Sequence, residues 1–284
     1  MTNLLLAKPL IEDTLPKLKD LCSQMSSPPK MRVILVGENQ ASVTYVKHKE
    51  KQCEKIGALF DLVKLPLDIS RDDFLQEIEK LNSDNSIHGG FVQLPLPKHL
   101  SDIDTTELIA PEKDVDGFGV ESFIGLIKNN YERGFIPCTP KGIMTLFETE
   151  NIDLTGKKAT VIGRSLIVGK PMALLLQNAG ATVTMCHSRT RNLKEHTLSA
   201  DIIISAVGKT KFLNADYFQK DQSQVLIDVG MNRDEENKLC GDIDFESVKD
   251  NVKAITPVPG GVGPMTVLSL MENLVLAKQR QEGK

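Results

Sequence analysis

The chain has 284 residues, of which 40% are hydrophobic and 25% charged, and its net charge at pH 7 is −4. This length accommodates one large or two medium domains, and the charge provides no basic field for nucleic acid. The five cysteines lack C-x-x-C spacing, which argues against a disulfide framework or a zinc site and for a reducing compartment. No histidine pair has metal-ligand spacing, so we expect no bound metal. Without a recognisable signal peptide or membrane-spanning run, we expect a cytoplasmic protein with no membrane partner.

Helical and strand-like segments alternate through the first half of the chain. The expected helices are 10–25, 41–56 and 74–81, and the expected strands are 31–37, 58–65 and 88–97. Such alternation predicts a parallel, doubly wound α/β sheet. Ligands in these folds bind beyond the carboxyl ends of the strands. Gln93 and the loop after it therefore lie where a ligand is expected.

The helix expected over 41–56 carries one lysine on its inner face. With residues placed about 100° apart, Lys49 falls in the same arc as Ser42, Tyr45, Val46, Cys53 and Ile56. The other lysines of this helix fall outside the arc. An inward ammonium is costly unless it is paired. Lys49 either extends past the apolar edge to water or is a desolvated amine whose lowered pKa allows it to transfer protons.

An acidic, glycine-containing segment, APEKDVDGFG, occupies 110–119, before a helix expected over 121–128. By default this composition indicates a solvated turn. A carboxylate here could also bind a cation or the N–H edge of a heterocycle. The acids do not have EF-hand spacing, so nothing supports a metal at this segment.

The second half begins at a proline-rich boundary, 135–142, and predicts a Rossmann-like domain. The expected elements are a helix over 143–150 and strands over 158–162, 182–186, 201–207 and 225–229. After the first of these strands, Gly163 and Gly169 bracket a turn that leads into a helix with Pro171 early. A strand, a glycine turn and a helix N-terminus together suit a phosphate. The spacing is G-x5-G rather than G-x-G-x-x-G, so these glycines could also serve only the bend.

The end of the second strand of this domain indicates which dinucleotide binds. NAD enzymes usually have an acid there for the ribose hydroxyl. Here the segment 186–190 is CHSRT, which supplies hydroxyls and Arg189 but no acid. Together with Arg164 in the glycine turn, this set suits the 2′-phosphate of NADP. The alternative is that Arg189 is only a solvated surface residue.

The segment TPVPGGVGPMT, 256–266, is too rich in glycine and proline for regular structure, and it precedes a helix expected over 267–278. Such a loop can bring backbone close to a flat ligand, or it can be a tight hinge. We expect the final helix to return to the first domain.

Six segments together resemble the bifunctional methylenetetrahydrofolate dehydrogenase/cyclohydrolase family, called FolD in bacteria. They are ASVTYVKHKEK (41–51), VQLPLP (92–97), PEKDVDGF (111–118), GRSLIVGKPM (163–172), CHSRT (186–190) and PVPGGVGPMT (257–266). The resemblance covers nearly the whole chain and implies oxidation of 5,10-methylenetetrahydrofolate to the methenyl form with NADP⁺. Hydrolysis to 10-formyltetrahydrofolate follows, within one-carbon metabolism and purine biosynthesis. It also implies two α/β domains with one folate cleft between them, and a homodimer joined through the cofactor domains.

The resemblance also implies roles for individual residues. The catalytic group would be Lys49, Tyr45, Gln93 and Asp116, with Lys49 essential for hydrolysis and Asp116 binding the pterin. The remaining substrate contacts would be Val92, Leu94, Pro259, Gly260, Gly261, Val262 and Gly263. The cofactor would be held by Gly163, Arg164, Ser165, Ser188 and Met231, the last standing where the family commonly has Ile. The implied domains are 1–138 plus 267–284 for folate and 139–266 for NADP.

Two alternatives belong to different classes of protein. One is an NAD-linked relative with dehydrogenase activity only, which a comparison of turnover with NADP⁺ and NAD⁺ would reveal. The other is a folate- or nucleotide-binding regulatory module without catalysis, which a missing Lys49 or Gln93 would favour. Both residues are present.

Overall fold

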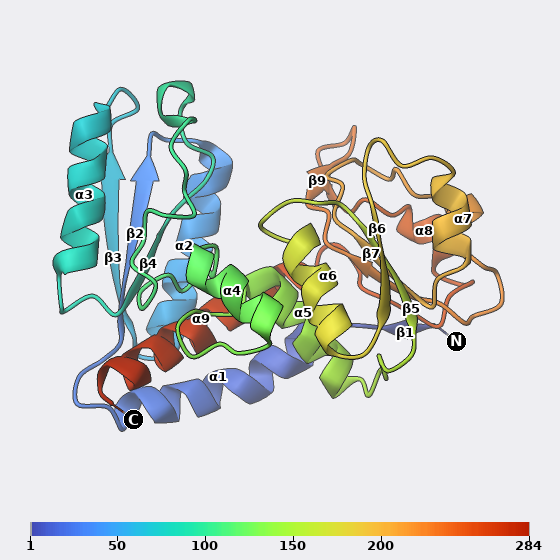
Figure 1. Ribbon diagram of the computed structural model, residues 1–284, viewed down its shortest axis with the longest axis horizontal. Coiled ribbons are helices and arrows are strands. Elements are labelled where there is room, and N and C mark those ends of the chain that lie inside the picture. Colours follow the sequence, from blue (N-terminus) through green and yellow to red (C-terminus); the bar gives the residue numbers. More distant parts are fainter. Residues whose placement is uncertain (1, 284) are drawn as a thin grey trace. The chain divides into compact units, whose positions relative to one another are not determined.

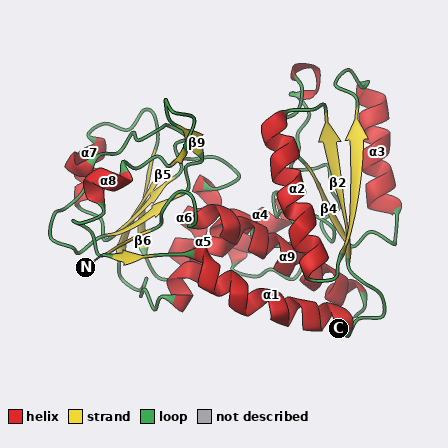
Figure 2. Ribbon diagram, turned by 180° about the vertical axis from the view of Figure 1, so that it is seen from behind, coloured by secondary structure: helices red, strands yellow, loops and turns green. Residues whose placement is uncertain are grey.

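The computed structural model describes residues 2–283, except for the side chain of Ala41. The chain forms two compact units. Unit 1 comprises residues 1–11 and 139–266, and unit 2 comprises residues 12–138 and 267–284. Figure 1 follows the chain through both units, and Figure 2 distinguishes their helices and strands from the opposite side. Among residues 2–283, no helix combines the length and the apolar character that crossing a lipid bilayer requires.

Unit 2 is built on a parallel three-stranded sheet with the strand order β3-β2-β4. Helices α2 and α3 lie on opposite sides of this sheet (Figures 1 and 2). The elements are α1 (Ala7–Ser23), which begins in unit 1, β2 (Lys30–Val36), α2 (Gln40–Lys55), β3 (Leu59–Leu65), α3 (Arg71–Ser83), β4 (Gly89–Val92), the 3₁₀ turn η1 (Lys98–Leu100), α4 (Val120–Lys128) and α9 (Val262–Gln281), whose first five residues belong to unit 1.

The central strand of unit 2 explains why the sheet is covered on both faces. Five residues in succession, from Val33 to Gly37, are buried, and a continuous apolar run is typical of a parallel strand between helices. One face packs on α3 through Phe74, Ile78 and Leu81. The strand predicted over 88–97 is shorter than expected, because β4 ends at Val92 before the cis peptide bond between Leu94 and Pro95.

Unit 1 contains a six-stranded parallel sheet with the order β1-β11-β8-β7-β5-β6. Helices α5 and α6 lie on one side of it, and α7 and α8 on the other (Figures 1 and 2). The elements are β1 (Asn3–Leu4), α5 (Cys138–Thr149), β5 (Lys158–Ile162), α6 (Gly169–Asn178), β6 (Thr182–Cys186), α7 (Leu193–Leu198), β7 (Ile202–Ser205), η2 (Ala215–Tyr217), β8 (Val225–Asp228), β9 (Asn232–Arg233), β10 (Leu239–Cys240), α8 (Phe245–Val248) and β11 (Ala254–Ile255).

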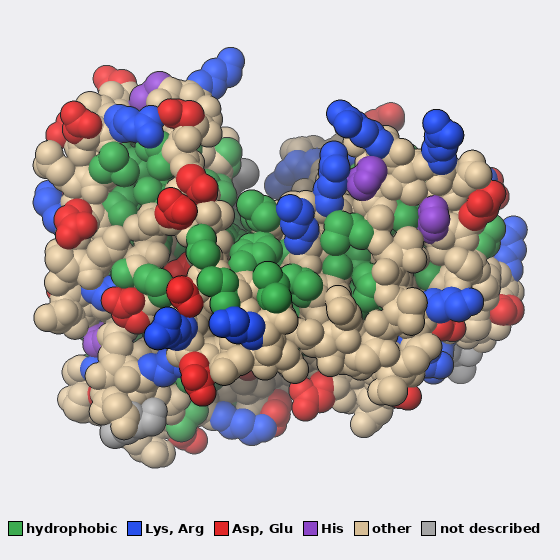
Figure 3. Space-filling model, in the orientation of Figure 1, with side chains coloured by type: hydrophobic (Ala, Val, Ile, Leu, Met, Phe, Trp, Pro, Cys, Tyr) green, Lys and Arg blue, Asp and Glu red, His purple; other side chains and the backbone are tan. Residues whose placement is uncertain are grey.

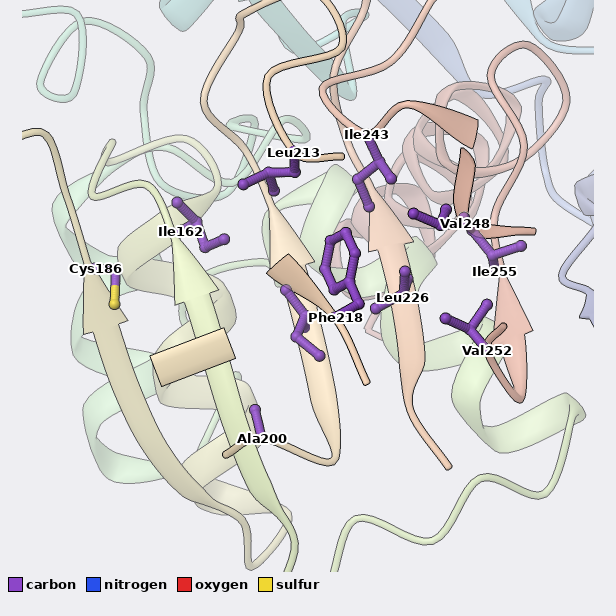
Figure 4. Packing of buried hydrophobic residues seen from close by; sticks show 11 residues of the cluster. Ile162, Cys186, Ala200, Leu213, Phe218, Leu226, Ile243, Val248, Val252 and Ile255 are labelled. Atoms are coloured by element: carbon purple, nitrogen blue, oxygen red, sulfur yellow. The ribbon is translucent and has the colours of Figure 1, made fainter. Parts of the chain in front are cut away.

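The core on the α7 and α8 side of this sheet fixes the loops at its carboxyl edge. Ile162, Leu226 and Ile255 come from the strands, and Phe218 and Val248 come from the connections between them (Figure 4). The predicted βαβ series and the two-domain α/β fold are confirmed.

The structure differs in two places from the expected course of the chain. Residues 1–11 belong to unit 1 rather than to the unit with residues 12–138, because β1 pairs with β11 at the sheet edge. The segment 256–266 is not wholly irregular, because α9 begins at Val262. Gly263 and Pro264 fall in its first turn, where backbone N–H groups have no partner within the helix and proline is tolerated.

Candidate active site

Helix α2 turns Lys49 inward, as its spacing predicts. The Lys49 side chain is only 4% exposed, while Val46, Cys53 and Ile56 on the same face are buried. Lys47 on the outer face is exposed. A lysine that reaches along the surface to water would keep its end exposed, so the inward placement is confirmed.

The ammonium of Lys49 faces aromatic rings. Its Nζ lies 3.7 Å from the ring centroid of Phe91 and 4.9 Å from that of Tyr45, within the range of cation–π attraction. Burial lowers the pKa of Lys49, and the negative charge of Asp116 opposes part of that fall. Burial raises the pKa of Tyr45, with Asp116 adding to the rise. The lysine is thereby brought closer to losing its proton, and the tyrosine holds its own more firmly.

Gln93 continues the edge of the sheet on which Phe91 lies. Its backbone N–H donates to the carbonyl of Ile34 at 2.9 Å, which extends the β2–β4 ladder beyond Val92. Alternate residues of a strand face the same side, so Gln93 faces the same side as Phe91. The Gln93 Nε2 donates to the carbonyl of Leu94 at 2.9 Å, whereas its buried Oε1 has no partner among residues 2–283. This oxygen is available to a ligand.

Phe91 is a site residue that the sequence analysis did not select. Its position two residues before Gln93 is the signal that could have identified it, since both occupy one face of the same strand. Val92, between them, is half-buried and Leu94 follows the strand end.

Asp116 lies in a turn that is buried rather than solvated. Asp114 and Asp116 are 5% and 9% exposed, so the default expectation of a solvated turn is wrong. The Asp116 carbonyl accepts a hydrogen bond from the N–H of Cys138 at 3.2 Å. Gly117 has a φ of +77°, and a Cβ there would lie 2.8 Å from the nitrogen of Pro137. Only glycine fits this close approach.

Helix α9 holds the same turn from its other side. The Nδ2 of Asn273 donates to the carbonyls of Val115 at 2.9 Å and Ile136 at 3.0 Å. Asn273 is itself buried. The final helix therefore contributes directly to the geometry of the Asp116 turn.

Two residues shortly before Asp116 in the sequence, Lys113 and Asp114, form hydrogen bonds to the backbone around them. The Nζ of Lys113 donates to the carbonyls of Leu81, Asn82 and Asp84 at 3.1, 2.8 and 2.9 Å, which satisfies the end of α3. Burial raises the pKa of Asp114 to about 6, although its carboxylate accepts the N–H of Gly119 at 2.6 Å. Within residues 2–283, no group of three or more His, Cys, Asp or Glu side chains is placed to hold a metal ion.

In unit 1, the glycine turn after β5 closes tightly around its two glycines. Gly163 has a φ of +133°, and a Cβ at Gly169 would lie 2.3 Å from the carbonyl oxygen of Gly163. The Ser165 Oγ accepts the N–H groups of Val168 at 3.1 Å and Gly169 at 3.3 Å, which orders the entry to α6. Arg164 is exposed. The close packing of this turn requires both glycines, because a Cβ on either one would meet backbone atoms of the turn or of Ala206.

The loop after β6 is ordered by hydrogen bonds, and its basic side chain, Arg189, is exposed. The His187 N–H donates to the Oγ1 of Thr190 at 2.8 Å, and the Arg189 N–H donates to the Nδ1 of His187 at 3.1 Å. Ser188 and Arg189 are exposed. Figure 3 shows Lys and Arg side chains along the upper margin of the unit on the right, which carries these strands.

Met231 and the segment 259–263 are both in unit 1. The Met231 side chain is 59% exposed, and its Cε lies 3.5 Å from the position of a Cβ on Gly263. The structure thus brings one expected cofactor residue beside one expected substrate residue. The carbonyl of Gly260 accepts the N–H of Ala7 at 3.0 Å, and Gly261 and Val262 are buried while Pro259 is exposed.

Two long segments of the chain match models of one protein family. The catalytic domain of tetrahydrofolate dehydrogenase/cyclohydrolase matches residues 5–116, and the NAD(P)-binding domain of the same family matches residues 137–282. The chain belongs to this family. A curated relative, the bifunctional protein FolD of Dechloromonas aromatica (strain RCB), is 52% identical over 255 residues, which cover 90% of this chain and 88% of the relative.

Solved structures of family members agree with this membership. The bifunctional enzyme FolD of Campylobacter jejuni is 44% identical, with a TM-score of 0.93 and 99% coverage of both chains. The methylenetetrahydrofolate dehydrogenase-cyclohydrolase of Trypanosoma brucei, complexed with NADP cofactor and inhibitor, is 29% identical, with a TM-score of 0.92 and coverage of 100% of this chain and 99% of that one.

Proposed function

We infer that this chain oxidises 5,10-methylenetetrahydrofolate to 5,10-methenyltetrahydrofolate with NADP⁺ and then hydrolyses the product to 10-formyltetrahydrofolate. The family match over both units and the FolD relatives support both reactions. The observation that supports the hydrolytic step most strongly is the desolvated amine of Lys49 beside Phe91 and Tyr45.

NADP is the cofactor, and we propose that it binds to the loops after β5 and β6 of unit 1. We propose that Gly163 and Ser165 shape the phosphate turn, and that Arg164, Ser188 and Arg189 face the 2′-phosphate. The cofactor supplies the hydride acceptor. Met231 would add an apolar contact at the other side of the cofactor.

We propose that Lys49 moves protons during hydrolysis. An amine with a lowered pKa can take a proton from water and return it to a ring nitrogen of the folate. The free Oε1 of Gln93 would hold a donor of the substrate or of the attacking water near the reacting carbon. Tyr45 would pack on the folate ring, and the carboxylate of Asp116 would accept N–H groups of the pterin.

The oxidation step asks less of these groups. A lone pair on a folate nitrogen expels the hydride, so the protein contributes mainly position. We propose that Val92, Leu94 and the segment 259–263 complete the substrate contacts. In this assignment, residues 1–138 and 267–284 form the folate-binding domain, and residues 139–266 form the NADP-binding domain.

We also propose that the enzyme is a cytoplasmic homodimer joined through unit 1. The edge strand β6 supports this assembly, because Thr182, Thr184 and Met185 are exposed along it and an unpaired edge can pair with another chain. Light scattering on the purified protein tests the dimer; a monomer at all concentrations would refute it.

One assay tests the two activities. Methylenetetrahydrofolate and NADP⁺ are mixed with the enzyme, and absorbance is followed at the separate bands of NADPH and the methenyl product. We expect NADPH to form and the methenyl band to rise and decay. The dehydrogenase-only alternative would be favoured if the enzyme turned over with NAD⁺ but not with NADP⁺. It would also be favoured if the methenyl band decayed no faster with enzyme than without it. Binding without turnover would favour the regulatory module.

A further inference from the structure

Asp242 is a fully buried carboxylate, 0% exposed, between β10 and α8. Its Oδ1 accepts the Lys209 N–H and the Asn232 Nδ2, both at 2.9 Å. Its Oδ2 accepts the Val207 N–H at 2.7 Å and the Ser205 Oγ at 3.1 Å. A carboxylate offers about four acceptor sites, so all of its capacity is used within unit 1.

The four donors share one location, the carboxyl edge of the unit 1 sheet. Ser205 ends β7, and Val207 and Lys209 lie in the loop after it. Asn232 begins β9 and directly follows Met231, in the connection after β8. This is the edge where doubly wound folds bind dinucleotides. One side chain therefore ties together two loops that belong to different strands.

The first of these loops contacts the glycine turn. A Cβ on Gly163 would lie 2.5 Å from the carbonyl oxygen of Ala206, and the Ala206 N–H donates to the carbonyl of Ile162 at 2.8 Å. Strands β5 and β7 are neighbours in the sheet. Any shift of the segment 206–209 would consequently alter the wall of the expected phosphate turn.

Asp242 is itself held in place. Its N–H donates to the Oδ1 of Asp228 at 2.9 Å, and its carbonyl accepts the Leu213 N–H at 2.9 Å. Leu213 and Ile243, the residue after Asp242, lie side by side in the core at the ends of the strands (Figure 4). The backbone of Asp242 is thus fixed, so its carboxylate can hold the loops in one position.

We propose that Asp242 is a positioning residue of the dehydrogenase, which holds the segments 206–209 and 231–232 in the shape that binds NADP. The proposal rests on the proposed function of unit 1. Asp242 acts through these backbone segments and not by touching the cofactor, because its oxygens are already occupied.

Replacing one oxygen by an amide tests the proposal. In Asp242→Asn, an NH₂ group replaces one carboxylate oxygen. This group is a donor, so it cannot accept hydrogen bonds from the N–H groups that face it. We expect the KM for NADP⁺ to rise about tenfold, equivalent to one lost buried hydrogen-bond partner. Asn232→Ala removes a single half-buried donor and should raise this KM about threefold without endangering the fold.

Three measurements distinguish positioning from general stability. The NADP⁺ dissociation constant is obtained by calorimetry without folate, the dehydrogenase KM and kcat are measured, and hydrolysis of supplied methenyltetrahydrofolate is followed without NADP⁺. We expect weaker NADP⁺ binding and unchanged hydrolysis. The matched control is Asp201→Asn, since the Asp201 carboxylate also accepts a backbone N–H, that of Lys158 at 2.8 Å, but at the amino edge of the same sheet.

If Asp242→Asn and the control Asp201→Asn lost hydrolysis and NADP⁺ binding to the same extent, Asp242 would be assigned to folding alone and the proposal would be overturned. Unchanged NADP⁺ binding in Asp242→Asn and Asn232→Ala would overturn it as well. If the unmodified enzyme lacked either activity, the proposed function would fail instead, which its own assay reports separately.

Discussion

The two units place their functional groups in opposite surroundings. In unit 2 the lysine on α2 is buried against aromatic rings, whereas in unit 1 Arg164, Ser188 and Arg189 are exposed on loops. Proton transfer near neutral pH needs a desolvated group with a shifted pKa. A large charged cofactor is bound best by exposed donors on a rigid support, and in unit 1 the buried carboxylate of Asp242 fixes the loop after β7. In the proposed function, burial therefore serves proton transfer in unit 2 and positioning in unit 1.

The largest effect is expected at Lys49. Lys49→Met keeps the length of the side chain and removes the amine, so hydrolysis of methenyltetrahydrofolate should fall by about 10²–10⁴-fold, the usual contribution of a general acid–base group. Folate binding should persist because the aromatic contacts stay. Steady-state hydrolysis and a folate titration measure the two quantities.

The matched control for that change lies on the same helix. Lys47 is exposed one half-turn away, and Lys47→Met should leave hydrolysis at the unmodified rate. Hydrolysis at the normal rate in Lys49→Met would remove the lysine from the mechanism and with it the contrast between the units.

The next largest effect is expected at Arg189, one of the exposed residues of unit 1. Arg189→Ala removes a charge-assisted contact to the 2′-phosphate, so kcat/KM for NADP⁺ should fall about 10–100-fold. The value for NAD⁺ should not change, because NAD⁺ lacks that phosphate. Arg191→Ala, at a nearby exposed arginine, serves as the control. Parallel losses with both dinucleotides would mean that Arg189 is not the specificity residue.

A smaller effect is expected at Asp116. Asp116→Asn should raise the KM for folate about tenfold while the KM for NADP⁺ stays constant, through the loss of hydrogen bonds to a charged acceptor. The change also removes the negative charge that raises the pKa of Lys49. The pKa of Lys49 should then fall further, so the acid limb of the hydrolysis pH profile should move to lower pH. A move to higher pH would contradict the placement of Asp116 near Lys49.

The smallest functional effect is expected at the second buried lysine of unit 2. Lys113 is 4% exposed like Lys49, but its Nζ donates hydrogen bonds to three backbone carbonyls. Lys113→Met should cost about 2 kcal/mol of stability and lower Tm by roughly 4–8 °C, with the pH profile of hydrolysis unchanged. A shifted profile at unchanged Tm would show that burial alone does not separate a functional lysine from a structural one.

Local pattern was sufficient to predict the inward lysine and the order of the elements. The periodicity of α2 identified Lys49, and alternating strands and helices predicted both sheets. Phe91, Lys113 and Asp242 were not selected, because their roles depend on partners distant in sequence. The segment around Asp242, CGDID, has the composition of a solvated turn, and nothing local indicates that four donors from other segments converge on it.

Chain course was the least predictable feature. A two-residue strand such as β1 has too little sequence to reveal a pattern, and its pairing depends on β11 near the other end of the chain. The start of α9 was missed for a related reason, since glycine and proline usually indicate loops but are tolerated in a first turn.

Neither unit is one continuous run of residues, and this has a consequence for how the protein is made. On the ribosome, the strand at residues 3–4 emerges first but meets its partner only after residues 254–255 have been synthesised. Unit 2 likewise lacks the Asn273 contacts until the final helix emerges. We therefore expect the nascent chain to reach its native state late and in both halves together, since pairings between distant segments form slowly.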